Sequence, residues 1–408
     1  MQELTDQTNP IQNTAKLTLS ILGRAGVREA VYYAERLGFT DICESFDVNE
    51  DNGTELPLAI LQETRYEFLN RVIRESNCKN IVDIACGFSP RGYIMAKEGY
   101  NYRGIDLEES VEVLSKIAGE LKKEGLAGSL SYVACDLTDP DALVKAVEDI
   151  DGEVLIVCEG LMIYLKPFEG RCLFQGLYRV LSLHGGRFVT PDFEMLSIYK
   201  EVHFALLGLE EGMKALMTMA NATSEKVDYK WGAHIASKGF DSEKLLSEEK
   251  LNVEKISFYS SSERCHVFDQ MQETDSKRVI EALLKLKGWS VTVNKDLGND
   301  ETLTSYNVPY KAECELQGNV LTIKIRGRVD SMTSNDLLEK YNEAKAGGQF
   351  TSIQIDCSNL VFISSAGLRV LMIMKNDVES GKVLMKNVSN TVREIFETTG
   401  FDSIVAMC

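Results

Sequence analysis

Residues 82–92 decide the fold of the larger part of this chain, and they read Val-Asp-Ile-Ala-Cys-Gly-Phe-Ser-Pro-Arg-Gly. An apolar strand runs into a loop that contains a glycine, and a helix follows the loop. Gly87 lets a ligand approach the backbone closely, because glycine has no side chain to block it. A strand, a glycine loop and a helix in this order indicate a nucleotide-binding α/β fold.

Working outward from this stretch, strands and helices alternate along the chain. Short apolar strands are predicted at 80–85, 100–105, 131–134, 154–157 and 186–190, with helices between them. This alternation predicts an α/β fold, namely a Rossmann-like domain with a mostly parallel sheet. Residues 1–75 are predicted to be mainly helical, with helical periodicity at 14–37 and 56–73. A long helical segment at 193–219 and closing strands at 253–259 and 289–294 complete the domain, which we expect to span 1–297.

Acidic residues recur at the ends of the predicted strands. Asp106 follows Asp83 by 23 residues, and a carboxylate at that place can accept both hydroxyls of a ribose. Asp136 ends the third strand, where it could meet an adenine amino group, and Glu159 ends the fourth. Each acid has a plainer alternative, since strand-end acids often cap the next helix.

The loop also indicates which nucleotide is bound. It lacks the full Gly-x-Gly-x-x-Gly spacing that admits a pyrophosphate, which disfavours NAD. S-adenosylmethionine carries a sulfonium and an ammonium group and no phosphate. A site with several carboxylates and no phosphate-binding lysine suits that molecule, so S-adenosylmethionine is the predicted cofactor.

The segment Glu-Gly-Leu-Met-Ile-Tyr-Leu at 159–165, with Asp-Leu at 136–137 before it, resembles the leucine carboxyl methyltransferase family. That family includes polyketide O-methyltransferases and is a branch of the class I S-adenosylmethionine-dependent enzymes. The resemblance covers roughly residues 15–295. It departs from the family where Gly-x-Gly-x-Asp is common, since Ala-Cys-Gly-Phe-Ser stands at 85–89.

The resemblance implies a role for each cofactor residue. Glu159 would hold the methionine end, and Asp106 the ribose. Asp136 and Leu137 would flank the adenine, and Arg65, in the helix before the first strand, would pair with the cofactor carboxylate. The predicted cofactor-binding set is Arg65, Asp83, Gly87, Asp106, Asp136, Leu137 and Glu159.

The methyl acceptor and the catalytic residues are not identified by the sequence. O-methyl transfer to a carboxylate needs no general base, whereas transfer to a hydroxyl needs one. His184, His203 and His234 lie in suitable regions, but none has a supporting motif, so a structural role is expected for each. Contacts with the acceptor are expected from 193–219 and from the acidic stretch 47–55.

A second motif stands near the C-terminus, at 356–371: Asp-Cys-Ser-Asn-Leu-Val-Phe-Ile-Ser-Ser-Ala-Gly-Leu-Arg-Val-Leu. A strand enters a Ser-Ser-Ala-Gly turn and a helix follows, which places a serine at a helix N-terminus. A phosphoserine would be tolerated there, because the helix dipole favours negative charge.

Residues 309–408, after a predicted linker at 298–308, resemble the STAS domain of sulfate transporters and bacterial anti-sigma factor antagonists. The match rests on this motif, on Gly-Arg-Val-Asp at 327–330 and on Thr-Gly-Phe at 399–401. The resemblance implies a small α/β domain, an anti-sigma factor that is also a kinase as partner, and Ser365 as the phosphorylated residue. The alternative for Ser365 is a plain helix N-cap.

Composition excludes several classes of function. The net charge of the 408 residues is −18, of which only −1 lies beyond residue 308, so a nucleic-acid or anionic-membrane surface is not expected. The ten cysteines form no Cys-x-x-Cys pair and the four histidines have no metal-ligand spacing, so neither disulfides nor a metal site is predicted. Residues 1–18 are polar and no run of about 18 apolar residues occurs. A cytoplasmic protein is therefore expected.

Two functions remain open at this stage. The first is a methyltransferase whose partner binding is set by a fused STAS domain. The second is a signalling adaptor, in which the large domain senses S-adenosylmethionine or is inactive and the STAS domain carries the output.

Overall fold

The computed structural model describes residues 10–38, 55–165, 167–224, 242–294, 310–329, 333–378 and 382–407. The chain divides into two compact units. The first holds Met1–Asp136, Val144–Lys166 and Leu177–Asn294, and the second holds Leu137–Leu143, Pro167–Gly176 and Lys295–Cys408. The predicted linker lies outside the described residues, as does most of 47–55, so the proposed domain bounds stay a prediction. No helix in the described part is long and apolar enough to cross a membrane.

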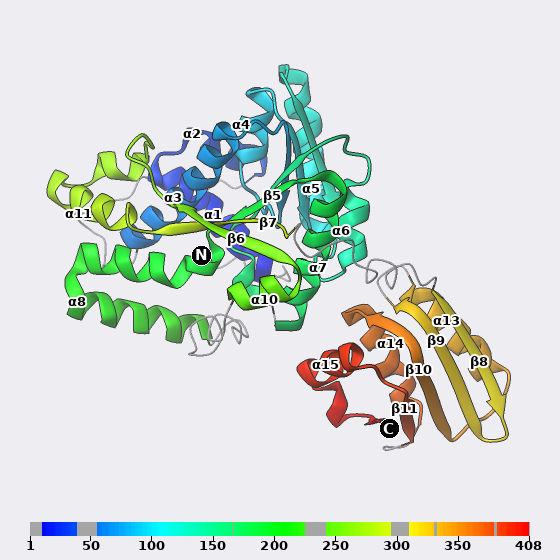
Figure 1. The fold of residues 1–408 in the computed structure, drawn as a ribbon. Coiled ribbons are helices and arrows are strands. Elements are labelled where there is room, and N and C mark those ends of the chain that lie inside the picture. The colour runs from blue at the N-terminus through cyan, green and yellow to red at the C-terminus, as the bar shows by residue number, and fades with distance from the viewer. Residues whose placement is uncertain are drawn as a thin grey trace. The chain divides into compact units, whose positions relative to one another are not determined.

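A seven-stranded sheet forms the centre of the first unit, with helices packed around it (Figure 1). Its strand order is β3-β2-β1-β4-β5-β7-β6, and the five strands from β3 to β5 are parallel, which confirms the predicted mostly parallel sheet. Only β7 runs antiparallel to its two neighbours. The strands are β1 (Asn80–Ile84), β2 (Asn101–Asp106), β3 (Ser129–Ala134), β4 (Val154–Val157), β5 (Gly186–Thr190), β6 (Leu251–Ser257) and β7 (Lys287–Val293).

The order of the strands marks one place in the sheet. β1 pairs with β2 on one side and with β4 on the other, so the chain crosses over in opposite directions around β1. In open α/β sheets, ligands bind outside the carboxyl ends of the strands at such a switch point. The register places Asp83 level with Gly104 of β2 and Val157 of β4, and therefore brings the ends of these three strands together.

In the described part of the chain, three helices precede the sheet: α1 (Pro10–Ala25), α2 (Arg28–Arg36) and α3 (Glu55–Glu75). The helical stretch expected at 14–37 is thus two helices, separated at Gly26. Gly26 has a φ of +111°, which is not helical, and a side chain there would lie 2.9 Å from the Cβ atom of His266. The close approach of a distant segment accounts for this glycine and for the break.

The long helical segment also differs from its prediction. α8 (Met195–Ser224) contains a non-helical Gly208, with φ 76° and ψ 176°. The chain reverses there, and Figure 1 shows the two halves as antiparallel green segments. A side chain at Gly212 would lie 2.7 Å from the Phe204 ring, so the second half packs closely on the first. The other helices of the N-terminal region are α4 (Arg91–Lys97), α5 (Glu108–Leu121), α6 (Pro140–Val147), α7 (Pro167–His184), α10 (Ser242–Glu248) and α11 (Glu273–Leu283).

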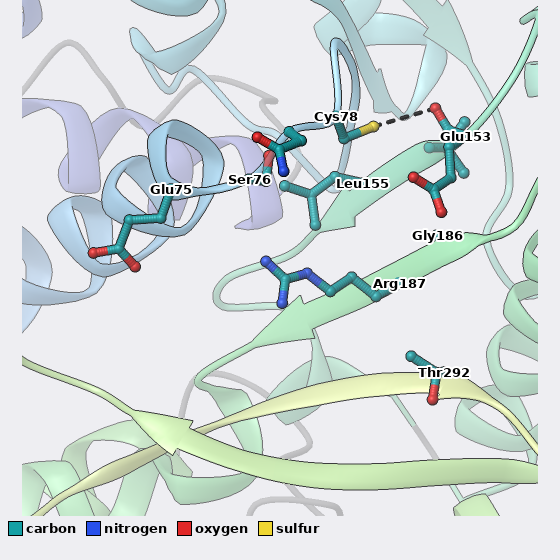
Figure 2. Close-up of a pocket in the computed structure, with 10 residues that line it drawn as sticks. Glu75, Ser76, Cys78, Glu153, Leu155, Gly186, Arg187 and Thr292 are labelled. Atoms are coloured by element: carbon teal, nitrogen blue, oxygen red, sulfur yellow. Dashed lines mark hydrogen bonds between the residues drawn. The ribbon is translucent and has the colours of Figure 1, made fainter.

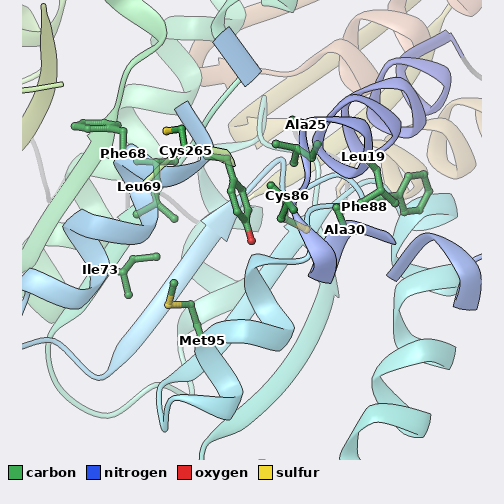
Figure 3. Packing of buried hydrophobic residues seen from close by; sticks show 14 of the residues in the cluster. Leu19, Ala25, Ala30, Phe68, Leu69, Ile73, Cys86, Phe88, Met95 and Cys265 are labelled. Atoms are coloured by element: carbon green, nitrogen blue, oxygen red, sulfur yellow. The ribbon is translucent and has the colours of Figure 1, made fainter. Parts of the chain in front are cut away.

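The hydrophobic core of the first unit extends from the N-terminal helices to the glycine loop. Figure 3 shows Leu19 of α1 and Ala30 of α2 beside Phe88 of the loop. Leu19 and Phe88 are 1% and 2% exposed. The N-terminal helices therefore support the loop directly, and their apolar faces gain burial free energy from it.

The second unit contains a five-stranded sheet in the order β12-β11-β10-β9-β8, of which only β8 is antiparallel to its neighbour. Three helices accompany the sheet. The sequence predicts strands near 311–316, 320–325, 351–356 and 382–386 and helices near 334–346, from about 365 and at 390–399, and all of them are present. The short β12 is an addition that the sequence did not indicate. The elements are β8 (Lys311–Gln317), β9 (Val320–Val329), α13 (Ser334–Ala346), β10 (Ser352–Ile363), α14 (Ser365–Asn376), β11 (Val383–Lys386), α15 (Asn390–Thr399) and β12 (Ala406–Met407).

Candidate cofactor site

The glycine loop after β1 is fastened to the end of β2 by Asp106. The Gly87 N–H donates to Asp106 Oδ2 at 2.7 Å, and the Leu107 N–H donates to Oδ1 at 2.8 Å. Gly87 has a φ of +51°, and a side chain there would lie 3.2 Å from the Cβ of Ala15 in α1. Burial raises the pKa of Asp106, although the backbone donors oppose the rise. Each carboxylate oxygen keeps a lone pair, so Asp106 can still accept from ribose hydroxyls.

A fully buried arginine, Arg91, lies at the start of α4. Its Nη1 donates to Asp83 Oδ2 at 2.7 Å, its Nη2 to Glu159 Oε1 at 3.0 Å, and its Nε to Asn70 Oδ1 at 3.0 Å. One guanidinium thus joins β1, α3 and the loop after β4. Burial alone would lower the pKa of Arg91, but the carboxylates of Glu159 and Asp83 raise it well above its usual value.

Asp83 is enclosed by this arrangement. It is 1% exposed, and its Oδ2 also accepts from the Tyr102 hydroxyl at 2.6 Å. Burial raises the pKa of Asp83, while Arg91 opposes the rise. In the described structure Asp83 contacts Arg91 and Tyr102, and its role in cofactor binding stays a prediction.

Two buried polar atoms at the switch point have no hydrogen-bond partner among the described residues. They are Glu159 Oε2, an acceptor, and Arg65 Nε, a donor. Arg65 is 5% exposed, and the one hydrogen bond of its side chain in the described structure runs from Nη1 to Gln62 Oε1 at 3.4 Å. Its Nη2 lies 3.0 Å from the place where a side chain at Gly160 would begin, so the two groups are neighbours. A buried unpaired charge is costly, and a ligand that supplies both partners would remove that cost.

A further carboxylate, Asp192, follows β5 and holds the turn beside Arg65. Its Oδ1 accepts from the Gly160 N–H at 2.7 Å, and its Oδ2 accepts from the N–H groups of Leu161 and Met162 at 2.8 and 3.0 Å. Asp192 has no exposed surface. Burial raises its pKa, and Arg65 opposes that rise.

Arg91 and Asp192 are two further charged residues at the candidate site that were not predicted from the sequence. Arg91 stands inside the stretch that decides the fold, where a charged residue among small and apolar neighbours was the available signal. Asp192 comes two residues after a predicted strand, as Asp136 and Glu159 do, and the same pattern could have identified it.

The remaining predicted site residues are Asp136, Leu137 and Ser365. Asp136, after β3, is exposed and Leu137 is buried, so both stay predictions for the adenine contact. Ser365 begins α14 in the second unit. Its neighbour Ser364 is the N-cap of that helix and accepts from the Gly367 N–H at 3.3 Å. Asp330, the last residue of the Gly-Arg-Val-Asp motif, lies outside the described residues.

The described histidines make contacts elsewhere. His203 is 3% exposed and its Nδ1 lies 2.7 Å from the Tyr199 carbonyl oxygen, while burial lowers its pKa. His184 ends α7 just before β5 begins, at the opposite edge of the sheet from the strand ends. His234 lies outside the described residues. Among the residues that the structure describes, no group of three or more could hold a metal ion.

A separate pocket of about 340 Å³ lies at the amino ends of β4 and β5 (Figure 2). It is lined by Leu155, Arg187 and Thr292, and Cys78 donates there to the Glu153 carbonyl oxygen at 3.2 Å. Leu155 and Arg187 lie near the starts of β4 and β5, whereas Glu159 and Asp192 follow the carboxyl ends of these two strands. The pocket is therefore distinct from the candidate cofactor site.

The family model described as "Mlab, STAS domain" matches residues 313–406. The C-terminal unit is therefore a STAS domain, as the sequence analysis expected. An anti-sigma factor antagonist from Mycobacterium paratuberculosis is similar to it in structure, at 19% identity and a TM-score of 0.22, covering 24% of this chain and 85% of that chain.

The N-terminal region is similar in structure to S-adenosylmethionine-dependent methyltransferases. One is magnesium protoporphyrin IX methyltransferase from Synechocystis PCC 6803 with bound SAH, at 16% identity and a TM-score of 0.31, covering 52% of this chain and 84% of that chain. Another is an S-adenosylmethionine-dependent methyltransferase from Clostridium acetobutylicum, at 19% identity and a TM-score of 0.25, covering 33% and 52%. No curated protein matches the sequence of this chain.

Proposed function

We propose that the N-terminal region is an S-adenosylmethionine-dependent methyltransferase and that the STAS domain is its interaction module. The observation that carries this proposal is the pair of unsatisfied buried atoms, Glu159 Oε2 and Arg65 Nε. The methionine end of the cofactor has one ammonium and one carboxylate, which are the groups that these two atoms lack. The residues present therefore fit the cofactor.

The charges around the switch point agree with a cationic ligand. Four carboxylates, of Asp83, Asp106, Glu159 and Asp192, face two guanidinium groups, of Arg65 and Arg91. The site thus has an excess of negative charge, and a ligand that brings a net positive charge would reduce the repulsion. A phosphate-bearing dinucleotide would increase it.

The protein's part in the reaction is to bind and align. The cofactor supplies a methyl carbon already activated by the sulfonium. Asp106 would orient the ribose from the end of β2, and Glu159, held by Arg91, would orient the ammonium. Arg65 would orient the carboxylate. These three contacts would hold the methyl donor in position for attack by an acceptor oxygen. We take this oxygen to be that of a carboxylate or a hydroxyl.

The test is calorimetric titration of the purified protein with S-adenosylmethionine. We expect dissociation constants in the micromolar range, and loss of binding in Glu159→Ala and in Asp106→Ala. Asp149→Ala, on the exposed surface, is the control and should bind as the wild type does. Absence of binding by the folded wild-type protein would refute the proposed cofactor.

For the STAS domain we propose a protein partner of the anti-sigma factor type that phosphorylates Ser365. A phosphate at the N-terminus of α14 would meet free backbone N–H groups and the positive end of the helix dipole. Incubation with candidate kinases followed by mass spectrometry tests the site. Ser364→Ala should retain the modification, and Ser365→Ala should lose it.

The signalling adaptor remains the second candidate. No described histidine contacts Glu159, Arg65 or Asp106, so no general base for transfer to a hydroxyl is identified there. Binding of S-adenosylmethionine without methyl transfer to any acceptor in a cell extract would favour it. Transfer of a labelled methyl group to one acceptor would favour the enzyme.

A further inference from the structure

Asp192 follows β5 and was not among the predicted cofactor residues. It begins a short turn after β5, and its own N–H donates to Thr190 Oγ1 at 3.1 Å. Its carboxylate has no exposed surface, and its oxygens already accept three backbone N–H groups, so they are engaged within the fold. Its influence on a ligand must pass through the groups around it.

The first such group is the turn after β4. Gly160 has a φ of +77° and Leu161 a φ of −98° and ψ of −46°, and this left-handed then right-handed sequence directs successive N–H groups to one point. Such a backbone nest normally binds an anion. Here the anion is the side chain of Asp192, which takes all three N–H groups of Gly160, Leu161 and Met162. The turn that begins right after Glu159 is thereby fixed.

The second group is Arg65. Burial raises the pKa of Asp192, and among the groups that oppose this rise the positive charge of Arg65 has the largest effect, so the two charges lie close enough to attract each other. Yet the described structure has no ion pair or hydrogen bond between them. The donors of the nest already satisfy the Asp192 oxygens, so the carboxylate attracts Arg65 without using its N–H groups. Arg65 Nε keeps no hydrogen-bond partner among the described residues.

We infer that Asp192 is a positioning residue for the amino-acid end of the cofactor: it fixes the turn beside Glu159 and orients Arg65 while touching neither the ligand nor the acceptor. This inference rests on the proposed function, because it assigns a role at that same site. It predicts that loss of the Asp192 charge affects only ligands that carry an amino-acid end.

Two ligands separate that role from a general loss of structure. S-adenosylhomocysteine has adenine, ribose and the amino-acid end, whereas 5′-methylthioadenosine has adenine and ribose alone. In Asp192→Asn, we expect the affinity for S-adenosylhomocysteine to fall about tenfold or more, as when a charge-assisted hydrogen bond is lost. The affinity for 5′-methylthioadenosine should stay within about twofold of the wild type.

Asp106→Asn is the matched control, since Asp106 is also a buried strand-end acid that accepts backbone N–H groups. It should weaken both ligands together, because both carry the ribose. Gly160→Ala is the second variant, for use if Asp192→Asn does not fold. It keeps the Asp192 charge, strains a left-handed residue and places a methyl group 3.0 Å from Arg65 Nη2, so it should also weaken S-adenosylhomocysteine selectively.

The outcomes distinguish the two proposals. If the wild type binds both ligands and Asp192→Asn weakens both equally or neither, the positioning role is overturned and the cofactor proposal stands. If the folded wild type binds neither ligand, the cofactor proposal fails and the positioning role fails with it. Selective loss of S-adenosylhomocysteine supports both.

Discussion

Arg91 Nη1 lies 2.7 Å from Asp83 Oδ2, and neither side chain exposes more than 1% of its surface. Two opposite charges are thus held away from water, in contact, below the glycine loop. A buried charge without its partner destabilises the folded protein, so replacing only one residue of the pair should be strongly destabilising.

We expect Arg91→Met to lower the free energy of unfolding by about 3–5 kcal/mol, because it leaves Asp83 and Glu159 buried without their partner. Urea denaturation measures this change. Arg74→Met is the control: Arg74 also pairs with a carboxylate, that of Glu98, but on the exposed surface, and its loss should cost less than about 1 kcal/mol. Equal effects of the two substitutions would contradict the central role of Arg91.

Glu67 should make stability depend on pH. Burial raises its pKa from 4.5 to about 7, although Arg74 opposes the rise. The folded protein therefore holds a proton on Glu67 between these pH values that the unfolded chain has released. The stability that this proton provides is present below pH 4.5 and is lost as the pH rises through 7.

Glu67→Gln removes that titration. We expect the variant to gain about 1–3 kcal/mol on the wild type between pH 5 and pH 8, measured by urea unfolding at both values. Glu75→Gln, on the exposed end of α3, should show no such gain. A difference between Glu67→Gln and the wild type that is the same at both pH values would exclude the raised pKa.

Gly367 in the STAS domain has no room for a side chain. An added Cβ would lie 2.6 Å from Ile363 Cγ1 and 2.7 Å from Val329 Cγ1, so α14 would have to move away from β9 and β10. We expect Gly367→Ala to destabilise the domain by about 1–3 kcal/mol in denaturant unfolding. Gly347→Ala, where the nearest atom is 3.4 Å away, should be close to neutral.

Ser364 caps α14, and its replacement should have a modest and purely local effect. Ser364→Ala loses the bond from the Gly367 N–H and should cost about 1 kcal/mol. Ser389→Ala, which removes the equivalent cap of α15, is expected to cost a similar amount. A loss several times larger at Ser364 would mean that its buried hydroxyl has a second role in the turn.

The sequence predicted those features that depend on neighbours along the chain. Strand ends, acids at those ends and the glycine loop are local patterns, and each predicted strand of the parallel sheet is present. The features that it missed depend on distant contacts. The break at Gly26 exists because His266 packs there, and the partners of Asp192 come from a turn some thirty residues earlier. Local periodicity in the sequence does not indicate contacts between residues so far apart along the chain.

The position of β7 has a consequence for folding during synthesis of the chain. β7 is the last strand of its sheet to be synthesised, yet it lies between β5 and β6. Until residues 287–293 leave the ribosome, β5 has an open edge and β6 has no neighbour in the sheet. An unpaired strand edge invites pairing with other chains. A nascent or truncated chain that stops before residue 287 would therefore be prone to aggregation, and the first unit matures only when its final strand closes the gap.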